Sequence, residues 1–405
     1  MEQPLPSLSA LAEAPAARVK TAIADRTGSA RLVSLDQFRG YTVLGMFFVN
    51  FVGGFAVIQD VFKHHVTYFS YADSIMPQFF FAVGFAYRLT LLRRLETVGA
   101  RAAYGHAVRR NLGLLLVAFM IHHLDGRYER WADLRDLGFW GFMTTSFQRE
   151  FFQTLTHIAL ASFWIMPVVA ASARIRIAFA CLSGGLFVVL SQLFYYDWVM
   201  HRPGIDGGPL GFLTWTIPMI VGTLAYDAVA PMLTPVPQRR WRIAIGRMLA
   251  WSAILMLLGY GLACLNRVTS PNAALSAETG TPAGMTSVFV EPPFVPPSLP
   301  VNLWTMSQRA GSISSFTFGA GLSLAVFALF ALACEVGGLR LGIFTTLGSN
   351  ALAAYIIHEL LMHAIKPLTP HDSPMAYVLA AVALFVALCY LFIRHLEKHK
   401  LFLKL

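Results

Sequence analysis

Apolar stretches of roughly twenty residues follow one another along most of the chain, with short polar segments between them. An α-helix of that length crosses the hydrocarbon core of a bilayer. We find no repeat of fixed period and no Walker or Rossmann pattern. The pattern predicts about ten membrane-spanning helices. They are expected near residues 41–59, 73–92, 107–124, 151–171, 176–196, 210–229, 243–265, 311–334, 343–365 and 375–393.

The composition agrees with this interpretation. Hydrophobic side chains make up 56% of the 405 residues and charged ones only 13%, a balance that a water-soluble domain of this size does not carry. The net charge of +10 would indicate nucleic acid in a soluble protein, but here Lys and Arg lie in turns between apolar stretches. We therefore expect an all-α fold, a polytopic helical bundle integral to the lipid bilayer, and no nucleic-acid partner.

The basic residues lie on one side of the predicted membrane domain. By the positive-inside rule this side is cytoplasmic, and an even number of spans puts both termini there. Groups of Arg and Lys follow the second, fourth, sixth and tenth predicted spans, at 88–110, 174–176, 239–247 and 394–400.

The chain divides into a tail and one membrane domain. Residues 1–30 are rich in Ala, Pro and Ser and lack an apolar stretch long enough for a signal peptide, so we expect a flexible cytoplasmic tail. Residues 31–405 are expected to form the transmembrane domain. A hairpin at 60–72 and a Pro-rich loop at 266–300 are predicted on its external side, and the loop is either disordered or a functional cover.

Candidate chemistry is concentrated around this hairpin. His64 and His65 lie in it, Asp73 follows it, and Asn50 lies inside the preceding apolar stretch, where a polar group is costly unless it has a partner or a task. Imidazole titrates near neutral pH and suits a general base. Simpler interpretations stay open: the histidines as interfacial polar residues, Asn50 as an interhelical hydrogen-bonding residue, and Asp73 as a helix cap.

Several blocks of sequence resemble a known family, the transmembrane N-acetyltransferases typified by heparan-alpha-glucosaminide N-acetyltransferase. The resemblance covers nearly the whole membrane domain from about residue 31. Its blocks are Ser34-Leu-Asp-Gln-Phe-Arg-Gly, Val49-Asn50, Phe62-Lys63-His64, Ala72-Asp73, Gly207-Gly208-Pro209-Leu210, Asn302-Leu303-Trp304-Thr305-Met306-Ser307, and Leu347-Gly348-Ser349-Asn350-Ala351-Leu352 with Tyr355.

The resemblance implies transfer of an acetyl group from cytoplasmic acetyl-CoA to the amino group of a sugar or glycan on the opposite face. The histidine at the reaction centre would be His64 by motif, with His65 one residue away as the alternative. Asn50 is a candidate donor to the carbonyl oxygen in the transition state. Asp73 would orient His64 and raise its basicity. Direct transfer and an acetyl-histidine intermediate both remain open.

Four residues near the cytoplasmic mouth are candidates for binding the phosphates of CoA. Asp36 and Arg39 share one helical face of the first span, and Arg88 and Arg94 follow the second. Guanidinium groups make bidentate contacts with phosphate. A local ion pair or cap for Asp36 and Arg39, and positive-inside topology for the other two, are the alternatives.

Two departures from the family pattern concern the acceptor. His157 stands where the family has an Arg, and the animal enzyme's lumenal domain has no counterpart here. We therefore expect a bacterial inner-membrane protein whose acceptor differs, with a homodimer left as an open alternative.

No metal is expected. His358 and His363 frame a sequence that looks like a zinc-protease motif, but they are five residues apart rather than four, so their side chains diverge around a helix. Two other functions remain as alternatives: a transporter or flippase for a sugar-like or lipid-linked substrate, and O-acetylation of a cell-envelope glycan.

Overall fold

The computed structural model describes residues 32–123, 130–149, 151–201, 206–233, 237–269 and 289–403. The elements in these ranges are all helices, as the composition predicts. The longer ones are α2 (Val33–Val52), α3 (Tyr71–Val98), α4 (Ala100–His123), α5 (Trp131–Arg149), α6 (Thr154–Ile165), α7 (Ala173–Leu190), α8 (Tyr196–Met200), α9 (Phe212–Val229), α10 (Gln238–Thr269), α12 (Ile313–Ala331), α13 (Gly342–Ser349), α14 (Ala351–Ile365) and α15 (Met375–Lys398).

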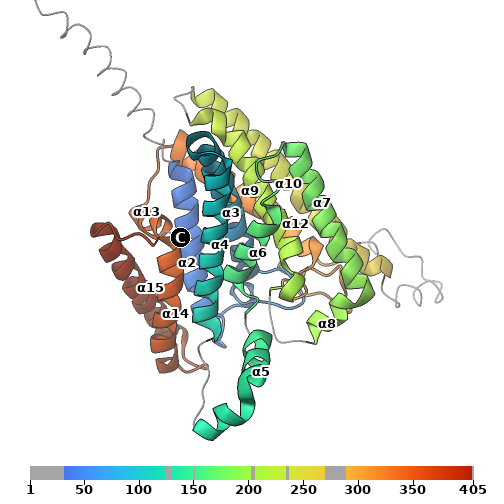
Figure 1. Ribbon diagram of the computed structural model, residues 1–405, viewed down its shortest axis with the longest axis vertical. Coiled ribbons are helices and arrows are strands. Elements are labelled where there is room, and N and C mark those ends of the chain that lie inside the picture. Colours follow the sequence, from blue (N-terminus) through green and yellow to red (C-terminus); the bar gives the residue numbers. More distant parts are fainter. Residues whose placement is uncertain are drawn as a thin grey trace, which may run out of the picture.

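The helices α3, α9 and α12 lie in the interior of the bundle (Figure 1). The most apolar stretches of α3, α9 and α12 are 61–72% buried, whereas those of α7 with α8, of α10 and of α15 are only 22–28% buried. Apolar side chains on the central helices pack mainly against protein, and those on the peripheral helices face outward. The bundle therefore has apolar side chains both in its core and on its outer surface.

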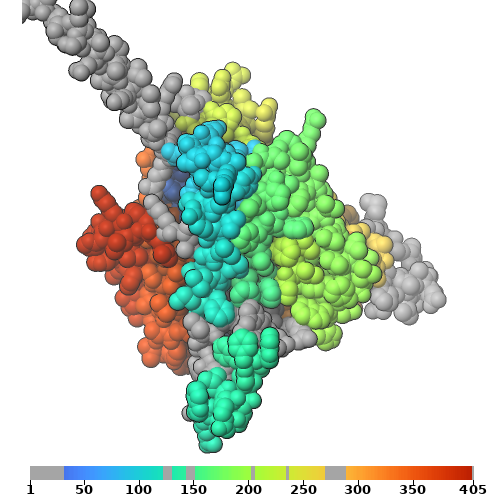
Figure 2. Space-filling view, viewed as in Figure 1, coloured from blue at the N-terminus to red at the C-terminus, as the bar shows by residue number. Residues whose placement is uncertain are grey.

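The outer surface is apolar as well. Leu182 on α7, Leu257 on α10 and Leu391 on α15 are each at least 60% exposed, and Figure 2 shows α4, α7 and α15 covering one face in cyan, green and red. Exposed apolar belts of this extent fit hydrocarbon rather than water. Among the described residues, six helices are long and apolar enough to cross a membrane, so the chain is a multi-pass helical membrane protein.

The central helices approach each other at glycines. A Cβ atom on Gly84 of α3 would lie 1.9 Å from the carbonyl oxygen of Met219, and one on Gly222 of α9 would lie 2.0 Å from that of Phe81. Only glycine leaves room for the two backbones to touch there. Small residues at helix contacts are the usual means of close packing in membranes, where the hydrophobic effect does not drive helices together.

The two ends of the bundle are each tied by hydrogen bonds between segments far apart in the chain. At the end where α2 begins, the Ser34 backbone N–H donates to the Glu335 carboxylate at 2.9 Å. We call this the N-terminal end. At the opposite end, the Gly207 N–H donates to the Arg309 carbonyl at 3.2 Å. We call that the hairpin end, because the segment at 60–72 lies there.

Some helix boundaries differ from those predicted. The first apolar stretch was expected at 41–59, but α2 ends at Val52, because Gly53 and Gly54 follow it and glycine favours a helix end. Asn50 therefore lies in the last turn of α2 and not in the middle of a span. The stretch predicted at 343–365 is two helices, α13 and α14, divided at Asn350, whose backbone is not helical.

Other predictions lie outside the described residues. These are the cytoplasmic tail at 1–30, the part of the Pro-rich loop at 270–288, and the side chains of His122, His123 and Asp125.

Candidate functional site

The hairpin at 60–72 brings His64 to the start of α3. The Nδ1 atom of His64 donates to Asp73 Oδ1 at 2.9 Å, and the second oxygen of that carboxylate accepts from the Ser70 backbone N–H at 3.0 Å. Ser70 completes a capping box by accepting from the Asp73 N–H at 3.2 Å. Asp73 thus has both roles that the sequence left open: it caps α3 and orients His64.

The side chains of His64 and Asp73 differ in their exposure to solvent. The Asp73 side chain is 2% exposed and that of His64 is 35% exposed. The Asp73 carboxylate is buried, and its Oδ2 atom is engaged in the helix cap. Only Oδ1 is therefore available to the His64 imidazole. The hydrogen bond at Nδ1 leaves Nε2 of His64 for a substrate.

His65 lies in a different environment. Its ring stacks on Tyr68 with centroids 4.0 Å apart, and its Nε2 atom lies 2.6 Å from the Asp60 carbonyl oxygen. Tyr68 also contacts Nε2 through its hydroxyl, at 2.7 Å. These contacts are made within the hairpin segment itself. Of the two histidines, His64 has the carboxylate partner suited to a general base.

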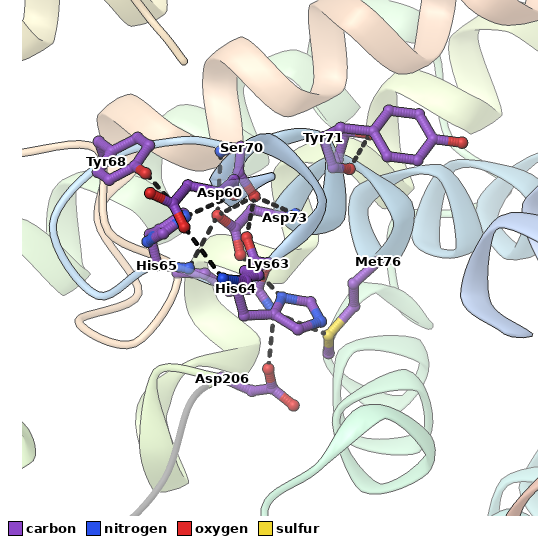
Figure 3. A network of polar contacts seen from close by, with 12 residues as sticks. Asp60, Lys63, His64, His65, Tyr68, Ser70, Tyr71, Asp73, Met76 and Asp206 are labelled. Atoms are coloured by element: carbon purple, nitrogen blue, oxygen red, sulfur yellow. Dashed lines mark hydrogen bonds and ion pairs between the residues drawn. The ribbon is translucent and has the colours of Figure 1, made fainter. Parts of the chain in front are cut away.

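His64 lies between two carboxylates, as Figure 3 shows. One is Asp73 and the other is Asp206, in the segment before α9. Partial burial lowers the pKa of His64, but the hydrogen bond to Asp73 and the charges of both carboxylates raise it further, to above its ordinary value of 6.5. The two carboxylates thus favour the protonated form of the ring.

Asp206 is almost completely buried, at 2% exposed. It accepts from the Gln308 side-chain amide at 2.8 Å, and its backbone carbonyl accepts from the Trp215 indole at 3.0 Å. Burial raises the pKa of Asp206 to about 6, although the Gln308 hydrogen bond and the His64 charge lower it in part. Burial thus favours the protonated form of the Asp206 carboxyl group.

Asp206 and Gln308 were not predicted from the sequence as site residues. Asp206 directly precedes the Gly207-Gly208-Pro209-Leu210 block, and Gln308 directly follows the block that ends in Ser307. A lone carboxylate beside two glycines and a proline is typical of a turn, so only its position next to a family-like block could have indicated a role.

Asn50 belongs to a second polar group at the hairpin end. Its amide donates to Nε2 of His358, on α14, at 3.2 Å, and Lys366 Nζ donates to its backbone carbonyl at 3.3 Å. His358 is fully buried, whereas His363 is exposed. The two histidines therefore diverge, as their five-residue spacing predicts, and His358 is the partner that makes the polar Asn50 tolerable in the last turn of α2.

Tyr355 connects the two polar groups. Its ring contacts that of His358 edge-on, with centroids 5.2 Å apart. The charges of Asp206 and Glu359 both act on its hydroxyl, so it lies close to each. Asn50, His358 and Tyr355 thus form one polar group, and the charge of Asp206 reaches Tyr355.

The N-terminal end carries a cluster of three arginines: Arg39 on α2, Arg94 on α3 and Arg110 on α4. Arg39 and Arg94 lie close enough to Arg110 for their positive charges to act on it. Two polar groups beside them are buried and have no hydrogen-bond partner among the described residues, the Tyr87 hydroxyl and the Asn111 amide nitrogen. We call these five residues the arginine cluster.

Two other predicted CoA-binding residues lie elsewhere at this end. Arg88 forms an ion pair with Asp227, 2.5 Å from Nε to Oδ1, and donates to the Val169 carbonyl at 2.5 Å. Arg176 pairs with the same Asp227 carboxylate. Arg88 thus ties α3 to α9, and its guanidinium is occupied by protein. Asp36 lies half-buried in the first turn of α2.

His157, where the family pattern has an Arg, is fully buried on α6. A Cβ atom on Gly211 would lie 3.0 Å from its Cε1 atom, and its ring centroid is 6.4 Å from that of Trp215. The residue therefore packs behind the turn that carries Asp206 and does not reach the described hairpin contacts.

Part of the Pro-rich loop lies against the hairpin. The Phe294 N–H donates to the Phe69 carbonyl at 2.8 Å, and the two rings meet edge-on at 5.9 Å. A small pocket of about 30 Å³ lies beside them and is lined in part by Tyr68, Glu291 and Met306. A pocket of this size holds about one water molecule.

Within the described residues, no group of three or more His, Cys, Asp or Glu side chains is arranged to hold a metal ion. The chain matches no protein-family model, and no curated protein matches it either.

Proposed function

We propose that this chain is a transmembrane acetyltransferase that moves an acetyl group from cytoplasmic acetyl-CoA to an amine on the opposite membrane face. The observation that carries the proposal is the His64–Asp73 pair, partly exposed at one end of a membrane bundle, with the buried carboxylate of Asp206 beside it. The family-like blocks around Asn50, His64 and Asp73 support the same activity.

The donor would bind from the N-terminal end. The arginine cluster offers three positive charges and two unpartnered polar groups, which suit the phosphates of CoA. Arg39 and Arg94, proposed from the sequence, belong to it; Arg110 adds a third guanidinium, and Arg88 is assigned a structural role with Asp227. The extended pantetheine arm would carry the thioester toward the hairpin end.

In the proposed acetyl transfer, His64, Asp73 and Asn50 have different roles. An ammonium acceptor first loses a proton to water. The neutral amine then forms the C–N bond, Nε2 of His64 accepts its second proton, and the C–S bond breaks as that proton passes to the thiolate of CoA. Asp73 would stabilise the imidazolium, and the N–H of the Asn50 amide that His358 does not accept would donate to the oxyanion.

We also propose ten spans with both termini cytoplasmic. The spans would be α2, α3, α4, α6, α7 with α8, α9, α10, α12, α13 with α14, and α15. Two hydrogen bonds support this count: Ser34–Glu335 joins the start of α2 to the segment after α12, and Gly207–Arg309 joins the segments that precede α9 and α12.

The test begins with the donor. The thermal midpoint of the purified protein would be measured with acetyl-CoA, CoA and a desulfo analogue, because a ligand that binds the folded state raises the midpoint. Amino sugars would then be screened for acetyl-CoA-dependent release of CoA, with product analysis to separate N- from O-transfer. His64→Ala is expected to abolish release, and His65→Ala, the matched control, to retain it.

The opposite results would contradict the proposal. No midpoint shift at millimolar acetyl-CoA, together with no release of CoA, favours a transporter, which moves its substrate unchanged. Full activity of a folded His64→Ala variant would exclude His64 from the chemistry.

A further inference from the structure

The Asp206 carboxylate is buried and forms no salt bridge with Lys or Arg among the described residues, although the charge of protonated His64 acts on it. Its described side-chain hydrogen bond comes from a neutral amide, Gln308 Nε2, to Oδ1 at 2.8 Å. Taking a carboxylate out of water is costly unless it is paired with a positive charge or well supplied with hydrogen-bond donors. One amide donor leaves most of this carboxylate's accepting capacity unused.

Gln308 adds a second unused acceptor. The side chain is 6% exposed, its Nε2 atom is engaged with Asp206, and its Oε1 atom has no hydrogen-bond partner among the described residues. Because Oε1 and Nε2 belong to the same amide, Oε1 lies next to the Asp206 carboxylate. Two buried acceptors, one of them a carboxylate, therefore lie side by side.

The His64 ring, which lies near Asp206, offers a third acceptor. Nδ1 of His64 is engaged with Asp73, so the neutral ring has its lone pair on Nε2. Asp206 and His64 act on each other electrostatically, and Figure 3 shows Asp206 on the opposite side of the His64 ring from Asp73. The three groups come from the hairpin, from the segment before α9 and from the segment before α12.

We infer that Asp206 and Gln308 form the binding site for the acceptor's ammonium group, directly beside His64. The inference rests on the proposed function, and it adds the residues that select a cationic primary amine. An ammonium has three N–H donors and one positive charge. It would donate to Asp206 Oδ2, to Gln308 Oε1 and to Nε2 of His64.

The same acceptors discriminate against a hydroxyl acceptor. A hydroxyl has one donor and no charge, so a neutral sugar would leave the buried carboxylate uncompensated and at least one acceptor unsatisfied. A hydrogen bond to a charged group contributes more binding free energy than one between neutral groups. The difference corresponds to about a tenfold higher affinity for the amine than for the alcohol. The site thus favours amines over alcohols at the binding step.

The experiment measures binding without transfer. Purified full-length protein, free of acetyl-CoA, would be titrated with glucosamine and with glucose near pH 7, and apparent affinities taken from the rise in thermal midpoint. The parent is expected to bind glucosamine about tenfold more tightly than glucose. Asp206→Asn, which keeps the shape and the Gln308 hydrogen bond, is expected to bind the two sugars equally.

Two further variants keep the test decisive. Asp197→Asn removes an exposed carboxylate on α8 at the same end and is expected to retain the preference. Gln308→Met removes the Oε1 acceptor together with the amide donor to Asp206, while the Asp206 carboxylate itself stays in place. Its preference for glucosamine is expected to fall by several fold even if Asp206→Asn does not fold.

Failure of this inference is separable from failure of the proposed function. No preference for glucosamine in the parent, including no binding of either sugar, overturns the ammonium site, as does a preference that Asp206→Asn retains. Transfer is scored separately: a preference for glucosamine without any acetyl-CoA-dependent product would keep the Asp206 site and overturn the transferase.

Discussion

The Asn50 side-chain amide donates to Nε2 of His358 at 3.2 Å, although 308 residues separate the two in the chain. His358 in turn donates from Nδ1 to the Tyr355 carbonyl, which fixes the tautomer with a lone pair on Nε2. The last turn of α2 is therefore held to α14 by a polar contact inside the bundle. Asn50 keeps one N–H for another acceptor.

This relationship predicts different outcomes for the two partners. Asn50→Ala is expected to lower kcat for acetyl transfer by about 100-fold or more, because it removes the proposed oxyanion donor. His358→Ala should instead lower the thermal midpoint, because it leaves the Asn50 amide without its partner. Parental kcat in a folded Asn50→Ala variant would contradict the oxyanion role.

The charge on Asp73 predicts a pH effect. Transfer requires neutral His64, whose pKa lies above 6.5, so the parental rate should rise with pH through a value above 6.5. In Asp73→Asn the effect of burial remains and that of the carboxylate is lost, so the rise is expected at lower pH, with a smaller maximum. The pH–rate profile measures both.

Ser70→Ala is the matched control for this prediction. It removes the hydroxyl of the capping box and keeps the Asp73 carboxylate, so it should lower the thermal midpoint by the loss of a cap, about 1 kcal/mol in stability. Its pH–rate profile should stay where the parental one is. If the pH–rate profile moved equally in Ser70→Ala and Asp73→Asn, the effect would come from loss of the helix cap and not from loss of the carboxylate charge.

Burial of Asp206 predicts a pH-dependent stability. Because its folded pKa is about 6 and its ordinary value is 3.8, the folded state holds the proton more tightly, and stability should fall as pH rises from about 4 to about 6. The loss is on the order of 3 kcal/mol at most. Asp206→Asn should have a thermal midpoint that falls less over this interval, and Asp197→Asn should behave as the parent does.

The arginine cluster predicts selectivity for the nucleotide part of the donor. Arg110→Gln is expected to weaken acetyl-CoA binding by about tenfold or more, because it removes a charge-assisted contact with phosphate. Binding of acetyl-pantetheine, which lacks the nucleotide, should change little. Arg109→Gln, an exposed neighbour on α4, is the control. Equal losses for both ligands would contradict a phosphate site.

Periodicity and composition predicted the helical membrane bundle, because long apolar stretches have few other folds available. They also located the His64 hairpin, whose partner Asp73 lies only nine residues away. Local chemistry such as a capping box is visible in a sequence because its parts are neighbours.

Contacts between distant segments were not predictable in the same way. Asp206 meets Gln308 across 102 residues. Arg88 was predicted from the sequence to bind a phosphate of CoA. Its ion-pair partner Asp227 is 139 residues away, and no residue near Arg88 in the sequence indicates that pairing. A charged side chain has the same appearance in a sequence whether it faces a ligand or a distant partner, and only the packing of α3 against α9 distinguishes the two.

The way the hairpin end is assembled has a consequence for biosynthesis. His64 and Asp73 are synthesised early and can pair as soon as α3 begins, whereas Asp206, Gln308 and finally His358 follow in that order from the ribosome. A nascent chain that stops before α14 would therefore contain the His64–Asp73 pair but not His358, the partner of Asn50. The polar site is completed only when nearly the whole chain has entered the membrane, so incomplete chains would be inactive during insertion.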